Sequence, residues 1–154
     1  MDHLAGDHPA QLITMTQSTP RSRVVPRGIR NNNPLNIRIG NVWLGEVRNP
    51  TDPDFEQFMS LEYGLRAAFV LLRRYINHYH RCNITEIISA WAPSSENLTQ
   101  KYIEHVSVQI GIAPDVLIRF EDAATMVRLV DAMAYHECGQ HVPIDSIKRA
   151  YWMA

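Results

Sequence analysis

Apolar residues recur at helical spacing along most of the chain beyond residue 60. Ser60 is suited to cap a helix, and the apolar side chains that follow lie on one face and predict a helix to about His80: Leu61, Leu65, Ala68, Leu72 and Ile76. The same pattern predicts further helices over residues 83–91, 98–110, 120–138 and 143–151. Asn83 and Asn97 are the expected caps of two of them, and Gly111 and Gly139 are expected to end two.

The segment before residue 60 has a different pattern. Residues 28–58 are rich in loop formers, and Asn31-Asn32-Asn33-Pro34 is a strong turn signal. Short extended pieces at 36–39 and 42–44, separated by Gly40-Asn41, predict a small hairpin. Residues 1–26 are rich in Thr, Ser, Gln and Pro without a period, which predicts a flexible leader. We therefore expect a mainly α fold with about five to six helices and a β-hairpin near the N-terminus.

Composition narrows the class of protein. With 154 residues, 45% hydrophobic and 20% charged, the chain fits one globular domain, and its net charge of −1 does not favour nucleic acid as a partner. Early arginines suit an anionic polymer or simply a solvated surface: Arg21, Arg23, Arg27, Arg30 and Arg38. Neither a membrane-length apolar run nor a secretory signal is visible. Cys82 and Cys138 are too few for a disulfide framework.

Glu137 is the carboxyl group best placed for acid catalysis. It falls in the last turn of the longest apolar predicted helix, where the helix dipole and the apolar surroundings both raise a carboxyl pKa. A general acid needs that environment, although a surface glutamate near a helix end fits the same spacing. Glu62 lies in the first turn of its helix, which lowers its pKa and suits a base or a ligand better than an acid.

Two polar stretches suit a sugar. The amides of residues 31–36 offer both donors and acceptors to hydroxyl and N-acetyl groups, although a tight connector is an equal reading. The stretch from Trp91 to Tyr102 combines two aromatics with Glu96 and Asn97, although both rings also fit a helical core. Residues 136–141 place their two His five apart, not four as in the HExxH zinc motif, so we expect neither a metal nor another cofactor.

Several motifs occur together in an order that is typical of one family: residues 28–38, Trp43-Leu44-Gly45, Phe55 and Phe58, Gly64-Leu65-Arg66-Ala67, Trp91-Ala92-Pro93, Glu96-Asn97-Leu98-Thr99, Tyr102 and His136-Glu137-Cys138-Gly139. In these the chain resembles the phage lysin and virion-protein family called structural protein P5-like, which is similar to lytic transglycosylases. It departs from the family at Leu35, where Gly is usual, and at Cys138, where Asn is usual.

The resemblance implies a lysozyme-like catalytic domain over residues 27–154. In that superfamily the helix-end Glu ordinarily precedes the Asn-rich stretch, whereas here it follows. This order predicts a circular permutation that places Glu137 beside the loop from Asn31 to Asn36.

The resulting functional hypothesis is cleavage of the β-1,4 bond between N-acetylmuramic acid and N-acetylglucosamine in peptidoglycan. Glu137 is the expected acid, and a hydrolase would need a second carboxylate, for which Glu62 and Glu96 are the candidates. The expected sugar-binding residues are Asn31, Asn33, Asn36, Tyr63, Glu96, Asn97 and Tyr102. Two alternatives stay open: a non-catalytic virion or wall-binding module, and a zinc amidase or endopeptidase.

The absence of a visible secretory signal also bears on how the protein reaches its substrate. We expect a monomer made in the cytoplasm and carried to the periplasm or wall by a holin, a virion or a secretion system. The hypothesis includes a phage lysin and a secreted antibacterial toxin with an immunity protein, and it includes neither nucleic acid nor membrane insertion.

Overall fold

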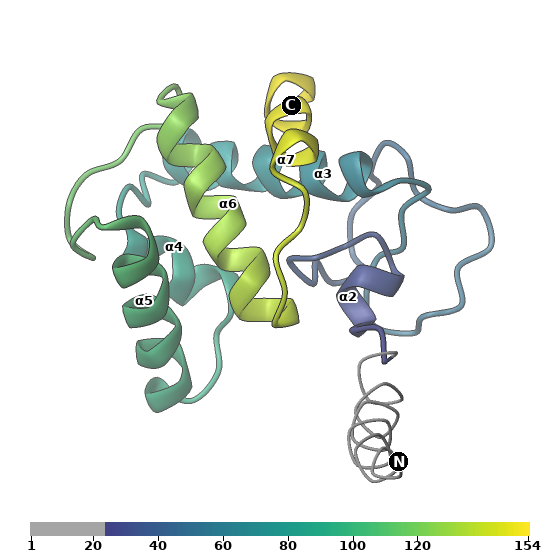
Figure 1. Ribbon diagram of the computed structural model, residues 1–154, viewed down its shortest axis with the longest axis horizontal. Coiled ribbons are helices and arrows are strands. Elements are labelled where there is room, and N and C mark those ends of the chain that lie inside the picture. The colour runs from purple at the N-terminus through teal and green to yellow at the C-terminus, as the bar shows by residue number, and fades with distance from the viewer. Residues whose placement is uncertain (1–23) are drawn as a thin grey trace, which may run out of the picture.

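The computed structural model describes residues 24–154, and the fold is mainly helical, as predicted (Figure 1). Within that range the chain forms six α-helices and one π-helical segment but no sheet: α2 Arg27–Arg30, α3 Leu61–Arg73, η1 Arg74–His78, α4 Ile84–Trp91, α5 Glu96–Ile110, α6 Ala123–Cys138 and α7 Ile144–Met153. None of these helices combines the length and the apolar content needed to cross a membrane. The predicted leader, residues 1–26, lies outside the described residues except for 24–26, which have no regular structure.

Two predicted helix starts are confirmed with their caps. The Ser60 hydroxyl accepts the Tyr63 N–H at 3.3 Å, and the Asn83 amide oxygen accepts the Glu86 N–H at 2.8 Å. The first of these helices continues past α3 into η1, so its last turns are wider than the sequence period suggests. Tyr75 lies in this widened segment.

Two other helix starts differ from the prediction. The cap of α5 is Ser95, whose hydroxyl accepts the Leu98 N–H at 3.3 Å, so Asn97 is already helical. Helix α6 begins three residues late because Asp122 accepts the Thr125 N–H at 3.2 Å. Both predicted C-terminal glycines are confirmed in the left-handed conformation: Gly111 at φ 70° and Gly139 at φ 74°.

The predicted N-terminal hairpin is wrong. Residues 36–39 and 42–44 do not pair with each other; Arg38 instead forms an isolated antiparallel bridge with Phe55, and Glu46 forms one with Phe58. Gly40-Asn41 does form a bend, but the backbone partners come from the polar stretch that follows residue 50. The segment from Ile37 to Phe58 is therefore a long loop fastened at two points.

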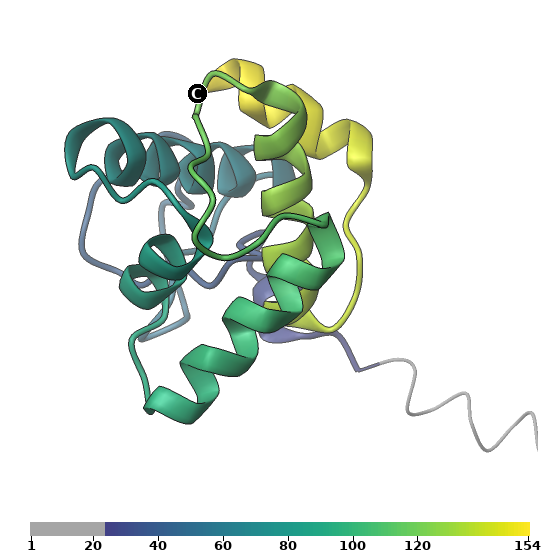
Figure 2. The same ribbon diagram turned by 90° about the vertical axis from the view of Figure 1, so that its left-hand side faces the viewer.

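Helix α6 lies at the centre of the fold (Figures 1 and 2). It packs against α5 on one side and against α3 and α7 on the other, and α7 lies across α3. The α6 side chains directed into the core have no exposed surface: Met126, Leu129, Val130, Met133 and Ala134. Burial of this stripe fixes the rotation of α6 and hence the direction in which its C-terminal turn projects.

Two glycines allow the amide-rich segment to lie close to its neighbours. A Cβ on Gly64 of α3 would lie 1.7 Å from the Asn32 carbonyl oxygen. A Cβ on Gly28 of α2 would lie 2.8 Å from both the Asn36 Oδ1 and the Cys138 Sγ. Only glycine fits at these contacts, which hold residues 31–36 between α3 and the end of α6.

Candidate functional site

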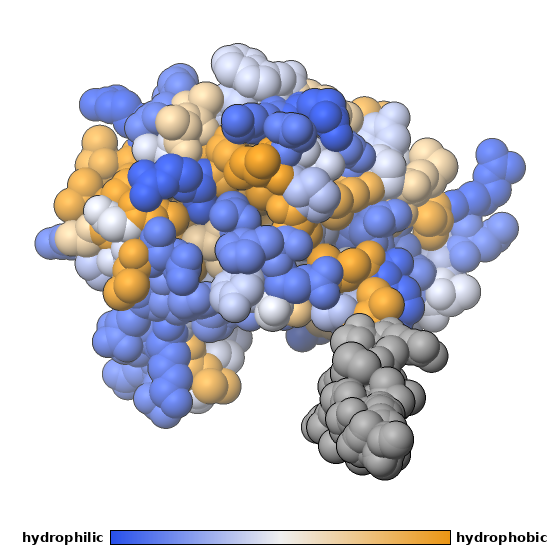
Figure 3. All heavy atoms as spheres, viewed as in Figure 1, coloured by the Kyte–Doolittle hydropathy of each residue, from blue (hydrophilic) through white to orange (hydrophobic). Residues whose placement is uncertain are grey.

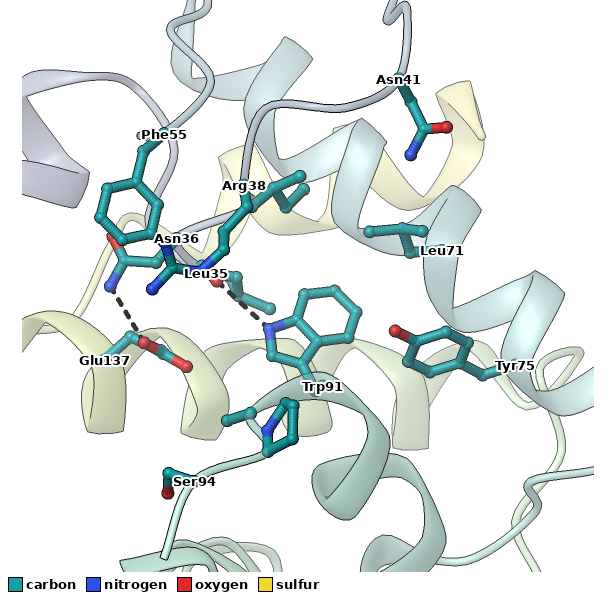
Figure 4. A pocket seen from close by; sticks show the side chains of 13 residues that line it. Leu35, Asn36, Arg38, Asn41, Phe55, Leu71, Tyr75, Trp91, Ser94 and Glu137 are labelled. Carbon is teal, nitrogen blue, oxygen red and sulfur yellow. Dashed lines mark hydrogen bonds between the residues drawn. The ribbon is translucent and has the colours of Figure 1, made fainter. Parts of the chain in front are cut away.

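Glu137 lies in the last turn of α6, facing the amide-rich loop. The Asn36 amide Nδ2 donates a hydrogen bond of 2.9 Å to the Glu137 Oε1 (Figure 4). The predicted proximity of Glu137 to this loop is therefore confirmed, although the two residues are far apart in the sequence. On the other side, the buried Tyr102 hydroxyl of α5 faces the same carboxyl group and has no well-formed hydrogen bond among the described residues.

Burial raises the pKa of Glu137 above its usual value of 4.5. The Asn36 amide and the Tyr102 hydroxyl oppose that shift because each interacts favourably with the ionised carboxylate. The net direction is upward, so Glu137 retains its proton at higher pH than an exposed glutamate does. Burial, followed by the charge of Glu137, also raises the pKa of Tyr102 well above 10, so the phenol stays a hydrogen-bond donor.

A hollow of about 470 Å³ opens on one side of Glu137 (Figure 4). We call it the larger hollow; the lining residues used below are Leu35, Asn36, Arg38, Phe55, Tyr75, Trp91, Ser94 and Glu137. The Trp91 indole donates a hydrogen bond of 3.2 Å to the Leu35 carbonyl and meets the Tyr75 ring edge-on at 5.8 Å. The indole is thus fixed in orientation with part of its surface open, as a stacking platform for a sugar requires.

A second hollow of about 330 Å³, the smaller hollow, lies on the α5 side. Its lining includes Leu98, Thr99, Lys101, Tyr102, His136 and Glu137. The His136 ring stacks on Tyr102 at 3.9 Å, and its Nδ1 lies 2.8 Å from the Nδ1 of His105. Figure 3 shows that the limb of the molecule formed by α5 presents a mainly hydrophilic face.

The two hollows meet at Glu137, which lines both of them together with Ala92 and Ser94. Glu137 is also the one acidic residue in either lining, among the residues that the structure describes. The arrangement is a groove with a single protonatable carboxyl group near its middle.

The other amides of the loop are engaged in holding it together. Asn33 is fully buried, and its side chain accepts the Ile37 N–H and donates to the carbonyls of Ile37 and Glu56 at 2.9 and 3.0 Å. The Asn31 amide donates to Asp52 at 2.9 Å. Asn31 and Asn33 are buried and line neither hollow, and their role in the structure is to shape the turn that presents Asn36.

Three further residues that were expected to bind sugar lie outside the groove. Tyr63 packs its ring against Gly45, where a Cβ would come within 2.2 Å of that ring. Glu96 and Asn97 are exposed on the first turn of α5 and line neither hollow. Of the expected binding residues, the structure brings only Asn36 and Tyr102 together with Glu137.

Glu62 is bound to α7 and does not line the groove. Its Oε2 accepts hydrogen bonds from the Ser146 hydroxyl at 2.9 Å and from the Arg149 guanidinium at 3.0 Å. Arg149, followed by the other hydrogen bonds, lowers the Glu62 pKa below 4.5. These contacts give Glu62 the geometry of a residue that joins two helices.

We expect Glu62→Gln to lower the free energy of unfolding at pH 7 by about 0.5–1 kcal/mol, since Arg149 is largely exposed and water screens its interaction with Glu62. A carboxyl whose folded pKa is lowered stabilises the fold above its unfolded pKa, and this contribution is lost as pH falls through the folded pKa. The difference between wild type and variant should therefore shrink in acid. Urea denaturation at pH 7 and pH 3 measures it, with exposed Glu104→Gln as the matched control. Loss of cleavage in a folded Glu62→Gln protein would instead favour a catalytic role.

Sequence reasoning missed several groove residues. Trp91 fitted a core position better than a binding site, and Arg38 fitted a solvated surface. The sequence pattern around each residue does not show which loop packs opposite it in the fold. Tyr75 is directed by the η1 segment, and α-helical periodicity carries no signal for that change. His136 adjoins Glu137 in sequence, and this proximity to the expected acid was a usable clue.

The cysteines are both free thiols, and one of them supports the site. The Cys138 thiol donates to the Pro34 carbonyl at 3.1 Å, where the family usually has Asn. Burial, followed by the charge of Glu137, raises the Cys138 pKa to about 11, so this thiol is unreactive near neutral pH. Within residues 24–154, no three His, Cys, Asp or Glu side chains gather closely enough to hold a metal ion.

Comparison with known proteins places the chain in a phage family. It is similar to Protein P5 of Pseudoalteromonas phage PM2, with 38% identity over 130 residues that cover 81% of this chain and 79% of that protein. The chain therefore belongs to the phage Protein P5 family, which confirms the P5-like part of the resemblance seen in the sequence. The sequence matches no family model.

Proposed function

We propose that the protein cleaves the glycan strands of bacterial peptidoglycan at the β-1,4 bond between N-acetylmuramic acid and N-acetylglucosamine. One observation carries the proposal: a half-buried carboxyl group with a raised pKa lies where two hollows meet. A general acid that serves a polymer must be protonated and must be flanked by binding surface on both sides. The partly open Trp91 ring suits a sugar on one side, and on the other side Thr99, Lys101 and His136 line space for the next ring.

The proposed reaction uses Glu137 twice. Its proton passes to the glycosidic oxygen as the bond from that oxygen to C1 breaks. The 6-hydroxyl of the same sugar then attacks C1, and its proton returns to the Glu137 carboxylate. The product is a 1,6-anhydro ring, and no water is consumed. We favour this transglycosylase route over hydrolysis because the groove, within the described residues, has no second carboxylate to activate water.

The proposal includes a lysozyme-like domain with permuted chain order and a place of action in the periplasm or wall. The expected Glu-beside-Asn-loop arrangement supports the permutation. Membership of a phage family supports delivery by a virion or at lysis, and fits a virion component. The same membership also fits the second candidate, a virion protein that binds the wall without cutting it.

Product analysis tests the proposal. Purified wall peptidoglycan is incubated with the protein, and the soluble products are separated and weighed by mass spectrometry. We expect disaccharide–peptide products that end in 1,6-anhydro rings and are one water lighter than hydrolysis products. Reducing ends would contradict the single-acid route, and cut peptide stems would identify an amidase or endopeptidase. Wall binding without any product would favour the non-catalytic candidate.

A further inference from the structure

Arg38 is a cation in the larger hollow whose charge is not matched by any described residue. Its guanidinium lies 4.8 Å from the centre of the Phe55 ring, and it lines the same hollow as Glu137. In Figure 4 the side chain points from the loop into the hollow, toward the part where Asn36 and Glu137 lie. No carboxylate of residues 24–154 forms an ion pair with it.

A neighbouring arginine has the opposite environment. Arg27 also lies over Phe55, at 4.6 Å, but it binds Asp52 at 2.6 Å and Asp54 at 3.1 Å. These two carboxylates satisfy the Arg27 charge and hold the loop, so that the ring of Phe55 is fixed beneath both guanidinium groups. Arg38 thus has a fixed ring beneath it and its hydrogen-bond donors free.

The chemistry of an unpaired guanidinium favours a carboxylate as its ligand. A guanidinium offers paired N–H donors that match the two oxygens of a carboxylate, and stacking on a ring orients it with little further loss of side-chain freedom. The acidic residue nearest to it in the lining is Glu137, whose raised pKa favours the neutral form. The larger hollow therefore has net positive charge when the acid is protonated and ready to act.

We propose that Arg38 binds a carboxylate carried by the glycan, so that the groove selects acidic strands over neutral N-acetyl sugars. The inference rests on the proposed function, because it takes the larger hollow as the sugar site. Two sources supply the same group: the lactyl acid of a sugar without a peptide stem, and the acids of the stem itself. Arg38 is a binding residue in this role and transfers no proton.

Binding to Glu137→Gln protein tests the proposal without turnover. The three probes are disaccharide with a peptide stem, disaccharide with a free lactyl acid, and a neutral N-acetylglucosamine oligomer, each titrated calorimetrically. Adding Arg38→Gln should weaken at least one acidic probe about tenfold, since hydrogen bonds to charged groups are the strong ones. The neutral probe should be unaffected. Arg48→Gln, an exposed arginine of the same loop that lines neither hollow, is the control.

The outcomes separate the two proposals. Weakening of one acidic probe alone identifies the lactyl acid or the stem as the source, and added salt should reduce that affinity further. Equal weakening of all three probes, or of none, overturns the carboxylate role while leaving glycan cleavage standing. Failure of every probe to bind, together with no cleavage by the wild type, overturns both.

Discussion

Glu137→Gln is expected to abolish glycan cleavage while leaving the protein folded. The variant keeps the shape of the side chain and can still accept the Asn36 hydrogen bond, but it has no proton to give the leaving oxygen. Removal of a general acid costs about 100- to 10,000-fold in rate. Release of soluble fragments from labelled peptidoglycan measures the loss, and exposed Glu104→Gln on α5 is the matched control.

The stability of Glu137→Gln tests the raised pKa of Glu137 independently of activity. A carboxyl whose folded pKa is raised destabilises the fold once the pH exceeds its unfolded pKa, since folding then disfavours its ionised form. Glu137→Gln should therefore melt at a slightly higher temperature than wild type at pH 7, with little difference at pH 4. Wild-type activity should fall as the pH rises through the folded pKa of Glu137. Equal activity of the two proteins at a pH below the folded pKa of Glu137 would exclude Glu137 as the acid.

Gly64→Ala is expected to cause the largest loss of stability among single methyl additions. The added Cβ would lie 1.7 Å from the Asn32 carbonyl oxygen, and neither α3 nor the turn can move away without breaking core contacts. We expect a loss of about 3 kcal/mol or more in the free energy of unfolding. Alanine is otherwise favoured over glycine in a helix by about 1 kcal/mol. A loss of stability in Gly64→Ala would therefore come from the collision with the Asn32 carbonyl alone.

Gly40→Ala is the control for that loss. A Cβ there meets nothing within 4 Å, so the substitution should be neutral or slightly stabilising. Thermal denaturation of both variants makes the comparison. Cleavage by any folded Gly64→Ala protein should also fall, because displacement of Asn32 shifts Asn36 away from Glu137. Unchanged stability of Gly64→Ala would contradict the close packing of α3 on the loop.

The helices could be predicted because their signals are local. Ser60 and Asn83 each satisfy a free N–H three residues later, and Gly139 adopts a conformation that other residues avoid. The start of α5 was misplaced because Ser95 and Asn97 are equally good acceptors. Only the backbone direction set by the preceding turn decides between them.

The loop could not be predicted because its partners are remote. The pairing of Arg38 with Phe55 and of Glu46 with Phe58 depends on the course of the polar stretch between them. The sequence shows that the Asn33 side chain has donors and acceptors, but it does not show whether other groups of the protein already bind them. For this reason Asn33 was predicted to bind sugar. In the folded chain the Asn33 amide nitrogen donates hydrogen bonds to the carbonyls of Ile37 and Glu56.

The candidate acid was predicted better than its surroundings. Helix position and apolar neighbours pointed to Glu137, and the family motif order added Asn36. The groove around them combines Trp91, Tyr75 and Arg38 from different elements, and no spacing along the chain links these three residues. They come from the loop, from η1 and from α4, and their association is visible only in the fold.

The hydrogen bond between Asn36 and Glu137 joins residues 101 positions apart. At ordinary rates of translation, a ribosome adds Glu137 about 5–20 s after Asn36. During that interval the nascent polypeptide has the Asn36 amide but not the proposed acid, so on the proposed mechanism it should cleave no glycan. A protease that cuts between the two residues and lets the pieces separate would have the same effect. On the proposed mechanism, cleavage should therefore require that both residues are present in one folded molecule.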